Sequence, residues 1–242
     1  MGKEIFKFEN VKQLTVYMVL AAIFISSMTM LNILGTSRFL DLSFNFFDTR
    51  IPMIVAIGVL PYPITFLCTD LISEIYGKER AKTIVWIGLI VNLWLGFILW
   101  IGGNLPEFTT SAQSIESNNA FMTIRNLALG TITASMIAYF LAQYIDVIVF
   151  HYLKGLTKGK YLWIRNNGST MISQLVDTSA VILITHYLTG AIPLPKNMST
   201  FDGLMLLIFY GYIFKFFFAL VDTPIFYFAV KYIKKYLNVK DD

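Results

Sequence analysis

The chain has 242 residues, of which 56% are hydrophobic and only 14% are charged, and its mean hydropathy is +0.65. A soluble domain carries roughly 25% charged residues, because its surface must face water. The composition therefore excludes an ordinary soluble protein and indicates a membrane protein. The net charge of +4 does not indicate nucleic-acid binding in this setting, because Lys and Arg commonly mark the cytoplasmic side of membrane proteins.

Six apolar stretches are long enough to cross about 30 Å of hydrocarbon at about 1.5 Å per residue. The first follows a lysine-rich N-terminus, but it is too long for the core of a signal peptide and no small-residue cleavage pattern follows it, so we expect a retained first helix. The sequence thus predicts an all-α, polytopic integral membrane protein, a six-transmembrane-helix bundle that forms a single domain over residues 1–242. The predicted spans are approximately 14–34, 52–76, 81–103, 126–150, 168–190 and 203–233.

The second stretch is unusual because Pro61 and Pro63 lie in its middle. Proline removes a backbone N–H donor and clashes with the preceding turn, so we expect helix two to be broken or kinked at these residues. The half before the break, residues 51–60, could be a partly inserted or re-entrant segment. Within the uncertain segment 35–51, residues 39–47 (FLDLSFNFF) alternate in part and could form a short extended segment or an interfacial flap. The polar residues 104–119 are expected to form the largest exposed loop.

The distribution of Lys and Arg predicts the orientation of the six spans. Fourteen of the 19 basic residues lie in alternate connecting segments, which share one side of the membrane. Only four lie in the segments of the opposite side, and Lys215 lies inside the last span. The positive-inside rule therefore predicts that both termini are cytoplasmic.

Polar and ionisable side chains inside the predicted spans mark the candidate site. A charged residue costs about 2.5–3.5 kcal/mol to insert, so it faces the protein interior and is a functional candidate. Structural alternatives stay open: Lys215 could simply neutralise Asp177 or Asp222, since a buried charge is tolerated when it is paired. Asp70 and Glu74 could be solvated at the cytoplasmic rim. The candidates are Asp70, Glu74, Gln143, Asp146, Gln174, Asp177, Lys215 and Asp222.

The fourth and fifth spans share a small pattern. AQYID (142–146) and SQLVD (173–177) each place Gln and Asp three residues apart, on one helix face. Because consecutive spans run in opposite directions, the two pairs can face each other. A cavity lined by acids and amides suits a small solute with several N–H donors or a positive charge. A stripe of small residues in the fourth span predicts close helix packing, within the bundle or in a homodimer; it comprises Gly130, Ala134, Ala138 and Ala142.

The sequence carries none of the common enzymatic signatures. It has no His-Glu-x-x-His, no Gly-x-Ser-x-Gly elbow, and its single cysteine, Cys68, excludes a paired-cysteine metal site. GLTKGKY (155–161) misses the phosphate-loop pattern, because only three residues separate its glycines and Tyr161 stands at the Ser or Thr position. We therefore predict a non-enzyme with no catalytic residue, no metal and no cofactor. An intramembrane enzyme or assembly factor is the alternative from another class.

Four sequence blocks between about residues 50 and 230 carry a family resemblance. They are YPITFLCTDLISEIYGKERA (62–81), LAQYIDVIVF (141–150), STMISQLVDT (169–178) and YGYIFKFFFALVDTPIF (210–226). Together and in this order they resemble the queuosine precursor transporter family, also called the VUT or vitamin-uptake-transporter-like family. The resemblance implies a multi-pass protein of the bacterial inner membrane that takes up 7-deazaguanines for tRNA modification. The candidates are 7-cyano-7-deazaguanine, 7-aminomethyl-7-deazaguanine and queuine.

The matched blocks also imply roles for individual residues. A carboxylate can accept the N–H donors of a guanine-like edge, while a Gln amide can serve its carbonyl. The implied substrate-binding residues are Asp70, Gln143, Asp146, Gln174, Asp177 and Lys215, with Glu74 and Asp222 as supporting or gating residues.

The expected partners are the deazapurine solute and the lipid bilayer, with no nucleic acid bound directly. A homodimer and an ATPase partner stay open, as do the preferred precursor and the choice between facilitated and proton-coupled entry. The alternative function is the substrate-binding subunit of a multi-component vitamin-type importer.

Overall fold

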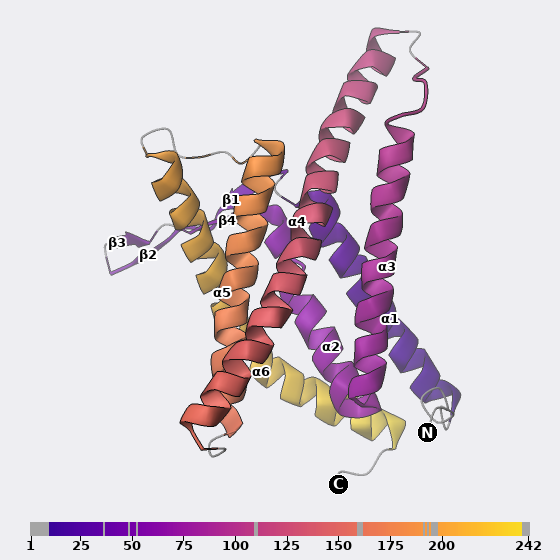
Figure 1. Cartoon of the computed structure of the whole chain (residues 1–242). Coiled ribbons are helices and arrows are strands. Elements are labelled where there is room, and N and C mark those ends of the chain that lie inside the picture. Colours follow the sequence, from indigo (N-terminus) through magenta and orange to yellow (C-terminus); the bar gives the residue numbers. More distant parts are fainter. Residues whose placement is uncertain are drawn as a thin grey trace.

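The computed structural model describes residues 10–35, 37–47, 49–51, 53–108, 111–158, 162–190, 192, 194 and 198–238. In this part of the chain, a bundle of α-helices surrounds the base of a short β-hairpin (Figure 1). The helices are α1 (Val11–Leu34), α2 (Tyr62–Tyr76), α3 (Lys78–Gly102), α4 (Ala112–Leu156), α5 (Leu162–Thr189) and α6 (Thr200–Leu237).

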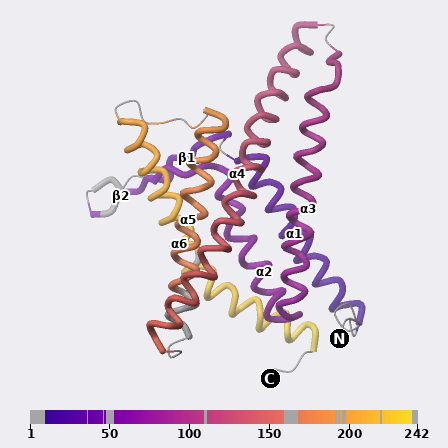
Figure 2. Tube along the Cα trace, viewed as in Figure 1, coloured from indigo at the N-terminus to yellow at the C-terminus, as the bar shows by residue number. Residues whose placement is uncertain are grey.

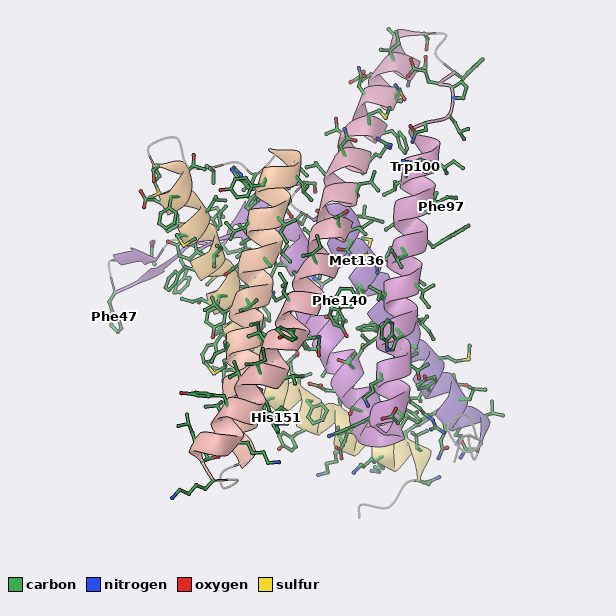
Figure 3. The ribbon with its side chains drawn as sticks, viewed as in Figure 1. Phe47, Phe97, Trp100, Met136, Phe140 and His151 are labelled. Carbon is green, nitrogen blue, oxygen red and sulfur yellow. The ribbon has the colours of Figure 1, made fainter. Side chains whose placement is uncertain are left out.

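Long apolar helices dominate the fold. Five of the described helices, α1, α3, α4, α5 and α6, are long and apolar enough to cross a membrane. Their outer surfaces carry large apolar side chains, as on α3, where Phe97 and Trp100 point away from the bundle (Figure 3). Such surfaces suit contact with lipid and not with water. The chain is therefore a mainly α-helical, polytopic membrane protein.

The predicted second span over residues 52–76 is wrong in its first half. Ile54–Ala56 form the strand β4, Ile57–Val59 form a 3-10 helix (η1), and α2 begins only at Tyr62. The two prolines lie at the N-cap and in the first turn of α2, so they begin a helix and do not break one. The physical reason is that the first N–H groups of a helix have no intrahelical acceptor, so a missing N–H is tolerated there.

The segment between α1 and α2 is an extended hairpin. β1 (Phe39–Asp41) pairs antiparallel with β4, and β2 (Phe44–Phe46) pairs antiparallel with β3 (Thr49–Ile51). The extended interpretation of this segment is therefore confirmed. β4 packs against α6, whereas Phe47 at the tip is 87% exposed and points away from the bundle (Figure 3). The hairpin thus has a base inside the bundle and a tip outside it.

The fourth helix is much longer than predicted. It begins at Ala112, because Ser111 and Ser114 form a reciprocal capping box at its N-terminus. The polar loop expected over 104–119 is correspondingly shorter. With 45 residues, α4 is about 68 Å long at the standard rise per residue. Its N-terminal part and the end of α3 extend beyond the other helices (Figure 1), where Arg125 donates a 2.9 Å hydrogen bond to the Leu99 carbonyl.

The small residues of α4 pack inside the bundle. Ala134 and Ala138 are fully buried, and α4 lies along α5 over much of their length. A side chain at Gly130 would collide with Thr189 of α5. This arrangement confirms the predicted packing seam and accounts for it within a single copy of the chain.

The sixth helix changes direction near Pro224. Its last part, residues 225–237, runs across the end of the bundle near α2 (Figures 1 and 2), and we call it the α6 limb. Proline within a helix removes a hydrogen bond and bends the axis. Phe226, Val230 and Ile233 of the limb pack against a core formed by α1, α2 and α3, so the limb closes the same end of the bundle at which α1 begins.

Candidate functional site

A cavity of about 360 Å³ lies inside the bundle, between α1, the hairpin base, α2, α4, α5 and α6. This volume is in the range of small-molecule sites. Its walls are mainly apolar and contain several rings, which could stack on a planar solute. The aromatic lining residues are Phe24, Phe39, Tyr62, Phe66 and Tyr139.

A charged pair lies in one wall of this cavity. The Nζ atom of Lys215 on α6 is 2.8 Å from Oδ2 of Asp177 on α5, and the two side chains are 7% and 20% exposed. The hydroxyl of Tyr62 donates to the same carboxylate oxygen at 3.4 Å. The ammonium group also lies 4.1 Å from the centroid of the Tyr62 ring, a cation–π contact. The pair satisfies the need of each buried charge for a partner.

The local fold explains why these three side chains meet. Tyr62 is the first residue of α2, so the proline-rich start of that helix determines where its ring lies. Gly211 lies one turn before Lys215, and a Cβ atom there would be 3.2 Å from Cγ2 of Thr178, the neighbour of Asp177. The missing side chain at Gly211 therefore lets α5 and α6 approach closely at the level of the charged pair.

The pair still has hydrogen-bonding capacity for a solute. Both contacts to Asp177 use Oδ2, and in the described part of the chain Oδ1 has no partner. The ammonium group of Lys215 has three N–H donors, of which Asp177 takes one. A solute edge with an N–H donor beside a carbonyl acceptor would therefore be complementary to this wall.

A second polar surface lies along α4. Four of its side chains recur at every fourth position and line the cavity: Thr131, Ser135, Tyr139 and Gln143. They extend over about 18 Å of helix. Of these residues only Gln143 was predicted from the sequence. The sequence does carry a signal for Thr131, Ser135 and Tyr139: their four-residue spacing places them on one helix face, next to the stripe of small residues.

The structure brings three of the predicted binding residues to the cavity and leaves the others elsewhere. Gln143, Asp177 and Lys215 belong to its lining, whereas Asp70, Asp146 and Gln174 do not. Asp146 accepts a 3.2 Å hydrogen bond from Ser173. This contact joins the two short motifs of α4 and α5 through Ser173, and the facing of the two Gln–Asp pairs stays a prediction.

The remaining acids lie between α2 and the bend of α6. Glu74 is 3.5 Å from Lys234 of the α6 limb, with 49% of the Glu74 side chain exposed. Asp222 lies near enough to Asp70 for the two charges to interact. Asp70, Glu74 and Asp222 therefore belong to the end of the bundle that the α6 limb closes. They form a group separate from the Asp177–Lys215 pair.

The fold and the cavity define a polytopic membrane protein with an internal site for a small solute. A family described as "Putative vitamin uptake transporter" matches residues 56–229, and the chain belongs to this family.

Three relatives carry more specific names. The chain is 30% identical over 178 residues to a "Probable queuosine precursor transporter" of Bacillus subtilis, covering 73% of this chain and 72% of that protein. It is 30% identical to a Haemophilus influenzae protein of the same name, over 54% of this chain and 51% of that protein. It is also 29% identical to the "Queuosine precursor transporter" of Escherichia coli, over 54% of each chain. No solved structure matches the chain.

Proposed function

We propose that this protein takes up queuosine precursors, which are 7-deazaguanines, across the bacterial inner membrane. The observation that carries the proposal is the buried Asp177–Lys215 pair in the wall of a solute-sized cavity. The names of the three bacterial relatives point to the same solute class. Uptake, and not chemical conversion of the solute, is the proposed activity.

The chemistry of the cavity is complementary to such a solute. The pyrimidine edge of a 7-deazaguanine presents N–H donors beside a carbonyl oxygen. In the proposed complex, Asp177 accepts N–H donors and Lys215 donates to the carbonyl. The rings of Tyr62 and Phe66, in edge-to-face contact with centroids 4.7 Å apart, form one aromatic surface beside the solute, and Gln143 contributes its amide from α4. Contacts between the solute and Asp70, Asp146 or Gln174 stay predictions, and they would belong to other stages of the solute's passage through the protein.

The proposed topology has six passages, of which the hairpin base and the short α2 together form the second. Both termini are cytoplasmic, and the α6 limb lies at the cytoplasmic end of one transporter domain over residues 1–242. The excess of basic residues on that side supports this orientation; of these residues, Lys3, Lys7, Lys160 and Lys240 lie outside the described part of the chain. Facilitated diffusion followed by intracellular trapping is the proposed mode of entry.

The test is uptake in bacteria that can neither synthesise nor import the precursors. Cells expressing this chain alone receive labelled 7-cyano- or 7-aminomethyl-7-deazaguanine, and queuosine in tRNA is measured. The proposal expects label in tRNA with at least one of the two compounds. Folded protein in the membrane without uptake of either compound would contradict it. Uptake that appears only after ATPase subunits are added would instead support the importer-subunit alternative.

The Glu74–Lys234 pair offers a test of the supporting or gating role that the family resemblance implies for Glu74. Glu74→Lys places two like charges between α2 and the α6 limb, so we expect the uptake rate to change by about fivefold or less, as for a partly exposed pair. The charge-swapped double variant, Glu74→Lys with Lys234→Glu, should return the rate toward that of the unmodified protein. A double variant that is as impaired as the single one would contradict a role for this ion pair.

A further inference from the structure

A buried amide network adjoins the cavity, on helices other than the two that carry the charged pair. Asn32 of α1 and Asn92 of α3 are 3% and 2% exposed. The Nδ2 group of Asn32 donates to Oδ1 of Asn92 at 2.7 Å, and the Ser135 hydroxyl of α4 donates to Oδ1 of Asn32 at 2.9 Å. α1 packs on α3 and α4, whereas α6, which carries Lys215, packs on α2, α5 and β4. The network and the charged pair therefore come from different helices, and α4, which carries Ser135, also packs along α5, which carries Asp177.

The direction of every hydrogen bond in this network follows from its far end. The chain of bonds ends at the backbone carbonyl of Gly88, to which Nδ2 of Asn92 donates at 2.8 Å. A carbonyl can only accept, so Asn92 must direct its NH₂ group to Gly88 and its oxygen to Asn32. Asn32 must then direct its NH₂ group to Asn92 and its oxygen to Ser135. The Ser135 hydroxyl must therefore give its proton to Asn32.

This polarity leaves Ser135 with a defined function toward the cavity. Its only O–H proton is committed to Asn32, so its oxygen can act toward a solute as an acceptor only. Ser135 and Asn32 both line the cavity, and Ser135 is the less buried of the two. The network thus presents an oriented acceptor to the interior and offers no matching hydroxyl donor. Polar groups buried in a membrane protein are costly unless they are paired, and here the hydrogen bonds among α1, α3 and α4 supply the pairing.

We propose that Ser135 selects free bases over their N-glycosides, by accepting the pyrrole-type ring N–H of the solute. This inference rests on the proposed function. When Asp177 and Lys215 hold the pyrimidine edge, the ring N–H of the five-membered ring lies on the far side of the bicycle, toward another wall. In a nucleoside this nitrogen carries the sugar, so the donor is lost and bulk is added. Asn32 and Asn92 are positioning residues that orient Ser135.

The experiment compares uptake of labelled 7-cyano-7-deazaguanine with uptake of its 9-methyl analogue, which lacks the ring N–H. The unmodified protein should prefer the free base. Ser135→Ala should reduce uptake of the free base by about fivefold, the usual effect of one neutral hydrogen bond, and should leave the 9-methyl analogue unchanged or improved. Ser135→Cys keeps the side-chain shape, with a larger and only weakly accepting sulfur in place of the oxygen, and should shift the preference in the same direction.

Thr133→Ala is the matched control, because Thr133 lies on the same helix, is exposed, and donates its hydroxyl to the Leu129 carbonyl. It should leave both rates unchanged. The inference would be overturned if the unmodified protein, Ser135→Ala and Ser135→Cys all preferred the free base over the 9-methyl analogue to the same degree. That result would leave the proposed function intact. Absence of uptake of both 7-cyano- and 7-aminomethyl-7-deazaguanine by the unmodified protein would instead contradict the proposed function itself.

Discussion

Asp177→Asn is expected to reduce uptake by at least about 100-fold and to destabilise the folded protein at the same time. The substitution leaves the ammonium group of Lys215 buried without a counter-charge, and breaking a buried pair in this way costs about 3–5 kcal/mol. It also removes the carboxylate that would accept the N–H donors of the solute. The measurements are the initial uptake rate per folded protein in the membrane and the thermal unfolding temperature of the purified protein.

A double variant separates the two effects of this substitution. Asp177→Asn with Lys215→Met removes both charges, so most of the stability should return, because a buried pair can be replaced by uncharged residues at little cost. Uptake should stay low, since both polar contacts to the solute are missing. Recovery of uptake would mean that the pair is structural only. Glu79→Gln is the control: its partner Lys82 is 2.8 Å away, both side chains are about two-thirds exposed, and the expected cost is below about 1 kcal/mol.

Gly58→Ala is expected to destabilise the protein by about 1–3 kcal/mol, the usual cost of overpacking. A Cβ atom at this position would lie 2.7 Å from the Gly35 carbonyl oxygen and 2.8 Å from that of Leu31. Both contacts are to backbone, which cannot turn away as a flexible side chain can. Gly58 also donates a 3.0 Å hydrogen bond to the Gly35 carbonyl, which ties the base of the hairpin to the end of α1. Thermal unfolding in detergent measures the effect.

Gly155→Ala provides the comparison for this prediction. Gly155 lies near the end of α4, and a Cβ atom there would meet nothing within 4 Å. Because alanine favours helix by up to about 1 kcal/mol over glycine, this variant should be neutral or slightly more stable. If the two variants unfolded at the same temperature, close packing at Gly58 would not be important for holding the hairpin against α1.

Several features of this protein could be predicted from the sequence, because they depend on local or additive physics. Five apolar runs are long enough to be membrane helices whatever surrounds them, since burying apolar side chains and pairing the backbone internally leave few alternatives in lipid. Asp177 and Lys215 could be recognised as candidates for a related reason. A charged side chain is costly to place in a membrane, so its presence indicates a partner or a function. The stripe through Ala134 and Ala138 predicted close packing in the same way.

Other features depended on where distant segments meet. Pro61 and Pro63 are compatible with a broken helix or with the start of one, and the pairing of β1 with β4 decided between them. An isolated Asn32 or Ser135 in an apolar run gives no sign of its partner 60 or 103 positions away.

The sequence by itself therefore determined that the chain lies in a membrane, where most of its helices run, and which charges need an explanation. Only the tertiary structure decided that Asp177 and Lys215 share a cavity with Tyr62 and Ser135, while Asp70, Asp146 and Gln174 lie outside its lining. The physical reason is that hydropathy is a sum over neighbouring residues. A binding site, in contrast, depends on the distances between side chains of helices that are far apart in the chain.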